Sequence, residues 1–165
     1  MPRLDATRLA VWRDLRVTVD GISRRIDADL REEWDISLAW FDVLASLQRL
    51  GGTARPLDLA ADLGVPASSI SRRLDRLAEE GWVARHRELE TDDLRAVDVE
   101  LTRTGRRLWR EMNVTFRRSV QTHFAGALVD DAVGELRSIV EVLESAATDA
   151  GLALDADGPP PHATP

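Results

Sequence analysis

The sequence predicts a mainly α-helical protein with one small β-hairpin, and three observations predict it. Apolar residues recur at steps of three and four along several segments, which is the spacing of one helix face. Two of these helices are separated only by a short turn at Gly64, and a pair of alternating segments follows them directly. A helix-turn-helix followed by a two-stranded hairpin is a winged helix-turn-helix, so the fold class is mainly α with a small β-wing.

Length and composition limit the class of protein. A chain of 165 residues is one domain with extensions, and it can bury a substantial core. The absence of Cys excludes disulfides and thiolate metal sites. No apolar run approaches the length of a membrane span, and the N-terminus has no apolar signal region, so we expect a soluble cytoplasmic protein.

The net charge of −7 argues at first against a nucleic-acid partner, because such proteins usually carry a basic surface. All 22 basic residues are Arg, and they are distributed unevenly. Residues 64–110 hold ten Arg and nine acidic residues, which is a net charge of +1, whereas the remainder of the chain has a net charge of −8. Only the middle of the chain is therefore suited to phosphates.

The N-terminal region, residues 1–36, is expected to form a dimerisation helix. From Asp5 to Leu30 the apolar residues form a seam that suits packing on another helix. The seam consists of Trp12, Leu15, Val19, Ile22, Ile26 and Leu30. The polar segment 32–35 breaks this pattern, and Ser37 is then the expected N-cap of a second helix that runs to about Leu50.

Residues 37–102 are expected to form the DNA-binding domain, centred on a helix within 66–82. A short helix over 55–63 precedes it. Ile70, Leu74 and Leu77 form one apolar stripe, and the opposite face offers small hydroxyl groups and guanidinium groups, which suit base edges and phosphates in a major groove. The candidate DNA contacts are Ser68, Ser69, Ser71, Arg72 and Arg76. From this segment alone, an ordinary amphipathic surface helix explains the pattern equally well.

Two strands are expected after this helix, over residues 83–89 and 96–101. The second alternates apolar and acidic residues, which is typical of a strand with one buried face. The polar residues between the strands would form the tip of a wing. Arg95 at such a tip suits a narrow minor groove with enhanced negative potential.

Residues 103–150 are expected to form two further dimerisation helices. The first follows Thr102 as its N-cap and runs to about Leu128, and the second begins near Asp130. Like the N-terminal helix, both carry more apolar surface than a winged helix can cover. We therefore expect the three helices to pack together and against a second copy in a twofold dimer. Residues 151–165 have nothing to bury and are expected to form a disordered tail.

Several short motifs, in order and spacing, resemble the multiple-antibiotic-resistance regulator (MarR) family over about residues 5–148. The matching stretches are SLAWFDVL (37–44), LAADLGV (59–65), the helix over 68–77, GWV (81–83), DLR (93–95) and LTRTG (101–105). The resemblance implies a dimeric winged-helix transcription factor, usually a repressor that a small molecule releases from DNA. It also implies that Asp93 and Arg95 belong to the DNA-contacting wing.

Two positions depart from the pattern of that family. Pro66 and Ala67 stand where the family commonly has Ser-Pro, so the hydroxyl cap of the recognition helix is either lost or moves to Ser68 or Ser69. Leu94 stands in the wing where the family typically has Arg, so one DNA contact per subunit is expected to be missing.

A finer resemblance, to urate- and phenolic-responsive members, concerns a small-molecule site. It matches Trp12, Asp42, Arg73 and Arg85, and it implies an aromatic or anionic, urate-like effector. Arg73 flanks the buried stripe and can point back toward the second helix, while Arg72 and Arg76 point toward DNA. A planar anion that competes with Asp42 for Arg73 would tilt the recognition helix. The open alternative is that Trp12 is a core residue and that Asp42 and Arg73 form a structural salt bridge.

The sequence indicates no other chemistry. The three His residues form no ligand cluster, there is no Gly-rich phosphate loop, and the serines have no nearby base. We therefore expect no metal, no cofactor and no enzymatic activity. The main interpretation is a homodimeric DNA-binding repressor released from a pseudo-palindromic operator by a small ligand. The alternative is a winged-helix protein-interaction module that does not bind DNA.

Overall fold

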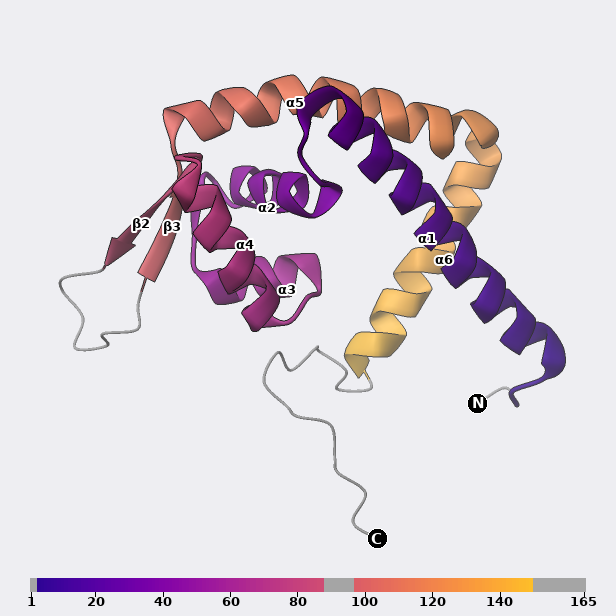
Figure 1. Cartoon of the computed structure of the whole chain (residues 1–165). Coiled ribbons are helices and arrows are strands. Elements are labelled where there is room, and N and C mark those ends of the chain that lie inside the picture. Colours follow the sequence, from indigo (N-terminus) through magenta and orange to yellow (C-terminus); the bar gives the residue numbers. More distant parts are fainter. Residues whose placement is uncertain (1–2, 88–96, 150–165) are drawn as a thin grey trace, which may run out of the picture.

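The computed structural model describes residues 3–87 and 97–149, and its elements follow the expected winged-helix order. They are α1 (Ala6–Trp34), α2 (Leu38–Arg49), β1 (Thr53–Ala54), α3 (Pro56–Leu63), α4 (Ala67–Glu79), β2 (Val83–Arg87), β3 (Val97–Leu101), α5 (Arg103–His123), η1 (Ala125–Ala127) and α6 (Asp130–Asp149). Helices α2, α3 and α4 form a lobe beside the strands, and α5 runs from this lobe to α6 (Figure 1). The predicted fold class is confirmed. None of the helices in the described ranges is long and apolar enough to cross a membrane.

Two helices end at residues other than those predicted. Helix α1 continues through most of the polar segment 32–35 and ends at Trp34, where Asp35 adopts a left-handed backbone with φ of 55°. The helix predicted to reach Leu128 ends at His123, and the short 3₁₀ helix η1 follows. Apolar periodicity shows which face of a helix is buried, but it does not locate the residue at which the helix ends.

The two predicted N-caps gave different outcomes. The Thr102 prediction is confirmed, because its Oγ1 accepts a hydrogen bond from the backbone N–H of Gly105 at 3.0 Å. Ser37 occupies the N-cap position of α2, but its side chain makes no capping hydrogen bond. The backbone N–H of Leu38 instead donates to Oδ1 of Asp27 at 2.8 Å. Helix α1 thus caps α2 with a side chain eleven residues earlier in the chain.

The strands form one antiparallel sheet in the order β1-β3-β2. The sequence did not reveal β1, because a strand of two residues is too short to show alternation. It anchors the base of the wing to the turn after α2, where the backbone N–H of Leu101 donates to the carbonyl of Gly52 at 2.8 Å. Gly52 has φ of 95°, a backbone conformation that residues with a Cβ rarely adopt, so this turn favours glycine.

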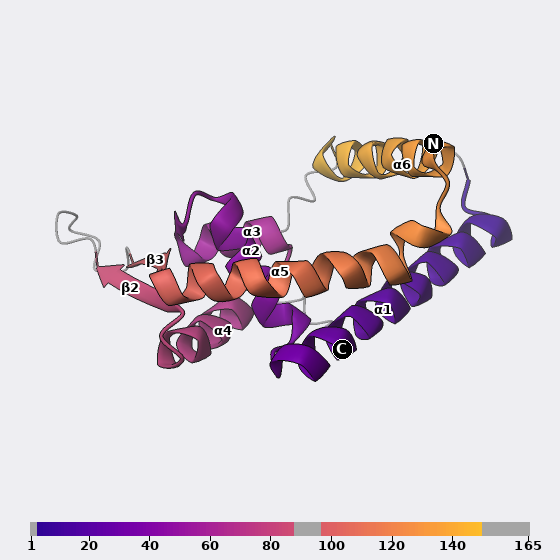
Figure 2. The same cartoon turned by 90° about the horizontal axis from the view of Figure 1, so that it is seen from above.

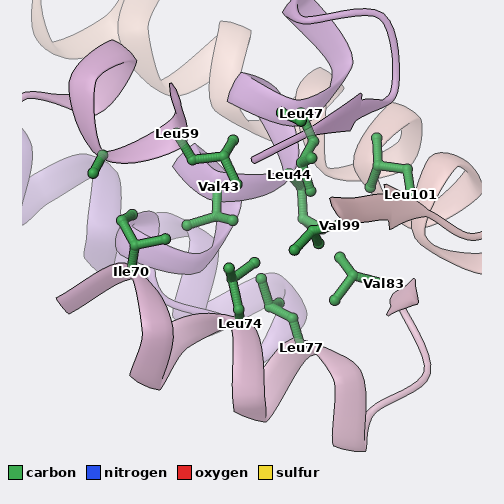
Figure 3. Close-up of a cluster of buried hydrophobic side chains, with 12 residues drawn as sticks. Val43, Leu44, Leu47, Leu59, Ile70, Leu74, Leu77, Val83, Val99 and Leu101 are labelled. Atoms are coloured by element: carbon green, nitrogen blue, oxygen red, sulfur yellow. The ribbon is translucent and has the colours of Figure 1, made fainter. Parts of the chain in front are cut away.

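The apolar stripe of α4 is the centre of the main core, as predicted. Ile70, Leu74 and Leu77 are fully buried and point toward α2 and the strands (Figure 3). Their partners there include Val43, Leu44, Leu47, Leu59, Val83, Val99 and Leu101. Burial of each side chain of the stripe contributes about 1.5–3 kcal/mol. Rotation of α4 about its axis would expose the stripe, so the opposite face of α4 is held outward.

A second core joins α1 to α5, which lie side by side (Figure 2). Its centre is apolar, with the rings of Phe41 and Phe116 stacked at a centroid distance of 4.5 Å. One polar group fastens its edge: the Asp29 carboxylate accepts hydrogen bonds from Ser119 Oγ and from His123 Nε2, the latter at 2.9 Å. The hydrogen bond from Ser119 lowers the pKa of Asp29 below its ordinary value, and the His123 contact adds to this effect.

The N-terminal half of α1 and residues 130–147 of α6 are not covered by other parts of the described chain. Within the predicted seam of α1 only Ile26 and Leu30 are buried, and Trp12, Leu15 and Val19 are exposed. None of the described side chains over 130–147 of α6 is buried. Within the single chain, α1 and α5 share this core and α6 lies apart from them (Figure 2), so the expected packing of the three helices in a dimer remains a prediction. An apolar groove of about 760 Å³ separates α6 from α1, and its walls include Leu15, Ile22, Phe124, Leu136 and Val140.

The Asp29 contact predicts a pH-dependent contribution to stability. Because the pKa of Asp29 is lower in the folded protein than in the unfolded chain, its contribution is present above the unfolded pKa of about 3.9 and is lost as the pH falls through the lower folded value. Asp29→Asn should lower the free energy of unfolding at pH 7 by about 0.5–1 kcal/mol, a modest value because the site is partly exposed. Chemical denaturation at one protein concentration measures it, with Asp14→Asn as the exposed control. This role would be contradicted if both variants lost the same free energy of unfolding. It would also be contradicted if the difference in that free energy between the unaltered protein and Asp29→Asn did not decrease toward pH 3.

Candidate nucleic-acid interface

Helix α4 has the position of a recognition helix, and it begins without a side-chain cap. Its N-cap residue is Pro66, whose side chain has no group that can form a capping hydrogen bond. The sequence left open whether Ser68 or Ser69 replaces the lost hydroxyl cap, and neither does. A glycine at each end, Gly64 with φ of 60° and Gly81 with φ of 71°, allows the chain to turn into and out of the helix.

The N-terminal half of α4 presents most of the predicted DNA contacts. Ser68, Ser71 and Arg72 are exposed, and Ser69 is half-buried. The Ser71 hydroxyl donates to the carbonyl of Ala67 at 3.3 Å within the helix. Arg72 forms no ion pair with any residue of the described ranges, so its guanidinium is available to an external acceptor. Small hydroxyl groups beside an unpaired arginine suit close approach to base edges and phosphates.

Arg76 is exposed, and its guanidinium also has two neighbours within the chain. Its guanidinium carbon lies 6.0 Å from the centroid of the Trp40 ring on α2, and its Nη1 lies 3.2 Å from the Glu79 carboxylate. Trp40 in turn packs edge-on against Trp82, at a centroid distance of 6.2 Å. Nothing in the local sequence around Trp40 indicates its contact with Arg76, which lies 36 positions later in the chain.

A shallow cavity lies beside Trp40 on the same flank of α4. It has a volume of about 240 Å³, and Trp40, Ser69, Arg72 and Arg73 line it. This flank combines an aromatic ring with guanidinium groups. Such a combination can hold a planar or phosphate-bearing group.

Arg85 lies on the other flank, where it joins the wing strand β2 to α4. Its Nη2 lies 2.7 Å from Oδ1 of Asp75 and also donates to the carbonyl of Ser71 at 3.4 Å. Asp75 was not among the predicted site residues, although its place on the polar face of α4 was visible in the sequence. The contact makes Arg85 a positioning residue for α4, because it ties the middle of the helix to the strand.

Asp42 and Arg73 lie near each other without forming the salt bridge that the sequence suggested. Both residues are in the described ranges, and no ion pair within 4.0 Å joins them. Burial raises the pKa of Asp42, and the positive charges of Arg73 and Arg49 partly oppose this rise. Arg49 is held by Asp62 of α3, which also accepts from Ser46. Because Asp42 is too far from Arg73 for a hydrogen bond, Arg73 has no hydrogen-bonded carboxylate among the described residues.

Trp12 does not join the other three predicted ligand residues within one chain. It is 63% exposed on the N-terminal half of α1, which projects away from the lobe of α2, α3 and α4 (Figure 1). The alternative that Trp12 is a core residue of the single chain is therefore wrong. Arg85 lies on the other flank of α4 from Arg73, where it pairs with Asp75, so the single chain does not bring the four predicted ligand residues together.

Two predicted site residues belong to the part of the chain that the structure does not describe. Asp93 and Arg95 of the wing fall outside the described residues, as does the predicted tail over 151–165. Within the described ranges, no group of three or more His, Cys, Asp or Glu side chains is arranged to hold a metal ion. The site geometry therefore rests on α4, on its two flanking contacts and on the base of the wing.

The chain is similar to known regulators in sequence. Residues 34–96 match the MarR family. The chain is 33% identical over 93 residues to the HTH-type transcriptional regulator PecS of Dickeya dadantii (strain 3937), which covers 53% of this chain and only 55% of PecS. It is 30% identical over 107 residues to the multiple antibiotic resistance protein MarR of Escherichia coli (strain K12), which covers 65% of this chain and 72% of MarR.

Solved structures share the fold over most of the chain. A mutant of E. coli MarR complexed with operator DNA matches with a TM-score of 0.72 and 26% identity, over 86% of this chain and 99% of that one. Sco3205 of Streptomyces coelicolor, in complex with DNA, matches with a TM-score of 0.78 and 22% identity, over 88% and 91%. The organohalide-sensing regulator RdhR, in its 2,4-dichlorophenol-bound form, matches with a TM-score of 0.77 and 18% identity, over 100% and 96%.

The family resemblance seen in the motifs is thus confirmed by an independent match to most of E. coli MarR and by the shared architecture. The chain belongs to the MarR family of transcriptional regulators.

Proposed function

We propose that this protein is a homodimeric, cytoplasmic DNA-binding repressor, released from a pseudo-palindromic operator by a small aromatic or anionic ligand. Residues 37–102 would bind DNA, and residues 1–36 and 103–150 would form the dimer. The observation that carries the proposal is the fixed orientation of α4. Its apolar stripe is fully buried, and the face that remains outside carries Ser68 and the unpaired Arg72.

The flanking contacts support a DNA-reading role for this face. Arg85 holds α4 to β2 through Asp75, and Arg76 rests on Trp40 of α2. A helix fixed on both sides can present its side chains to a groove without losing much conformational freedom on binding. E. coli MarR, the relative that is seen with operator DNA, is similar to this chain over the same elements.

The uncovered apolar surface supports the dimer. Trp12, Leu15 and Val19 are 63%, 42% and 52% exposed, and α6 has no buried side chain over residues 130–147. An apolar groove of about 760 Å³ is costly to leave in water and is large enough to accept helical side chains. A second copy placed about a twofold axis would cover these surfaces and would bring two α4 helices to successive major grooves, about 10 bp apart.

The small ligand would act through Arg73. Arg73 is a half-buried residue of α4, its guanidinium lacks a hydrogen-bonded carboxylate among the described residues, and it lies close enough to Asp42 to influence the charge of that carboxyl. An anion that binds Arg73 would repel Asp42 and displace α4 against its flanking contacts. RdhR, which shares the fold, is seen with a bound phenol. Trp12 would join the site only from the second copy.

Arg72→Ala should weaken binding to an operator duplex that the protein itself selects from a random library. Removal of one groove contact costs about 1–3 kcal/mol, or about 5- to 150-fold in affinity, and the slope of affinity against salt should also decrease. Fluorescence anisotropy measures both quantities, with Arg137→Ala on α6 as the control. A wild-type protein that binds selected and random duplexes equally would refute sequence-specific binding. Absence of any DNA binding at low salt would instead favour the protein-interaction module.

Leu15→Glu should disrupt the dimer, because it places a carboxylate in the apolar groove between α1 and α6. Sedimentation equilibrium should then give the mass of a single chain, where the unaltered protein gives twice that mass. Leu57→Glu is the matched control, since Leu57 is 58% exposed on α3 and lies outside the groove. Two variants that remain dimeric would show that this groove is not the interface.

Arg73→Ala should abolish the release of operator DNA by planar anions. Urate, xanthine and salicylate are the probes, and release is measured by anisotropy while Trp12 emission is recorded in parallel. Arg85→Ala should weaken operator binding even without a ligand, because Arg85 positions α4. Normal release from the Arg73 variant would exclude this residue as the anion site, and a response by neither protein would leave Arg73 with a structural role only.

A further inference from the structure

The outer face of α5 carries a straight row of arginines. Arg103, Arg107, Arg110 and Arg117 are separated by four, three and seven residues, so they lie on one side of a helix with 3.6 residues per turn. All four side chains are exposed. The buried residues Met112, Thr115 and Ser119 lie on the opposite side, against α1 and α2. We call these four arginines the α5 arginine row.

The charge of this row is not neutralised within the described part of the chain. No carboxylate there lies within 4.0 Å of any of the four guanidinium groups. Helix α5 contains six Arg and a single acid, Glu111, although the whole chain has a net charge of −7. Some exposed arginines on other helices have carboxylate partners, as in the Arg31–Asp27 pair of α1 and the Arg137–Glu141 pair of α6, and others, such as Arg72 of α4, have none in the described ranges. The row is therefore a concentrated positive surface on an acidic protein.

We propose that the α5 arginine row binds the phosphate backbone of a second DNA segment, separate from the one that α4 contacts. With a rise of 1.5 Å per residue, the row extends about 21 Å, which is the length of about six base pairs. A duplex presents one negative charge for about every 1.7 Å of its axis, and guanidinium groups bind phosphate oxygens in pairs. Val114, which is 66% exposed, lies on the same face between Arg110 and Arg117, so the row is interrupted once by an apolar side chain but by no carboxylate. Acidic protein surfaces intersperse neutral and basic groups among their carboxylates, so a row of four arginines on one helix face matches a continuous polyanion better.

The position of α5 explains why a second segment is required. Helix α2 contacts both α4 and α5, and in Figure 1 it lies between them. The α5 arginine row is on the side of α5 away from α2, so it faces away from α4 as well. We infer that a straight duplex on the N-terminal half of α4 would not contact the row of the same protomer. The inference rests on the proposed function only in that the first duplex is bound by α4. The α5 arginine row would bind the phosphates of the second duplex independently.

A bridging experiment tests the proposal on the full-length protein. An operator duplex selected from a random library is fixed to beads and saturated with protein, and retention of an unrelated fluorescent 30-bp duplex is then measured at low salt. The unaltered protein should retain the second duplex. Substitution of Arg107, Arg110 and Arg117 by Gln should lower retention at least fivefold while operator binding remains. The salt slope of retention should fall by about 0.9 for each phosphate that the variant no longer neutralises.

A matched variant separates the row from a general charge effect. Substitution of Arg13, Arg24 and Arg137 by Gln removes the same three charges from exposed positions on α1 and α6, and retention should stay close to that of the unaltered protein. Circular dichroism and sedimentation establish that both variants fold and assemble alike. An equal decrease of retention in both variants would overturn the assignment to α5.

The remaining outcomes also decide between the partners. No retention of the second duplex by the unaltered protein would overturn the proposal, and retention of fluorescent poly-glutamate in its place would assign the row to an acidic protein. If the protein binds no operator at all, the proposed repressor function fails separately. The row is then tested by binding of the random duplex alone, where the α5 variant must bind at least fivefold more weakly than the control variant.

Discussion

The burial of three side chains, Ile70, Leu74 and Leu77, determines what the rest of this molecule can do. They fill the centre of the main core, and turning α4 to any other orientation would expose them to water at a cost of several kcal/mol. The polar face of α4 is therefore held outward by the apolar one. The wing strands contribute Val83, Val99 and Leu101 to the same core, so the helix and the wing share one rigid support.

The two flanks of α4 differ in the kind of contact that holds them. On the wing side, Arg85 and Asp75 form a direct ion pair, which is sensitive to geometry and fixes the distance between helix and strand. On the α2 side, Arg76 rests on the face of Trp40, and the charges of Arg73 and Asp42 interact without a hydrogen bond. A charged ligand that binds Arg73 would act on α4 at the flank near α2, where no direct ion pair between Arg73 and Asp42 has to be broken.

Local signals in the sequence were sufficient for the helices, the hairpin and the α4 stripe, because each depends on a repeat of about four or two residues. These local signals were insufficient wherever a residue contacts another residue that is distant in the sequence. The cap of α2 comes from Asp27 of α1. The two-residue strand β1 is recognisable only through its pairing with β3. Arg76 of α4 lies over the ring of Trp40, which belongs to α2. Conversely, the prediction that Arg73 and Asp42 pair directly failed, since helical spacing gives the direction of a side chain but not its separation from a neighbour.

The distribution of exposed apolar surface connects the proposed dimer with the proposed ligand site. A single chain buries the C-terminal half of the α1 seam against α5 and leaves the N-terminal half, with Trp12, in contact with water. In the proposed dimer, the second copy would cover that half and would also supply a Trp12 that approaches Asp42 and Arg73. Dimer formation and completion of the proposed ligand site would then depend on the same contact between two chains. A ligand held at that junction would touch the surface that sets the spacing of the two α4 helices, so its binding would be coupled to DNA binding through the geometry of the dimer.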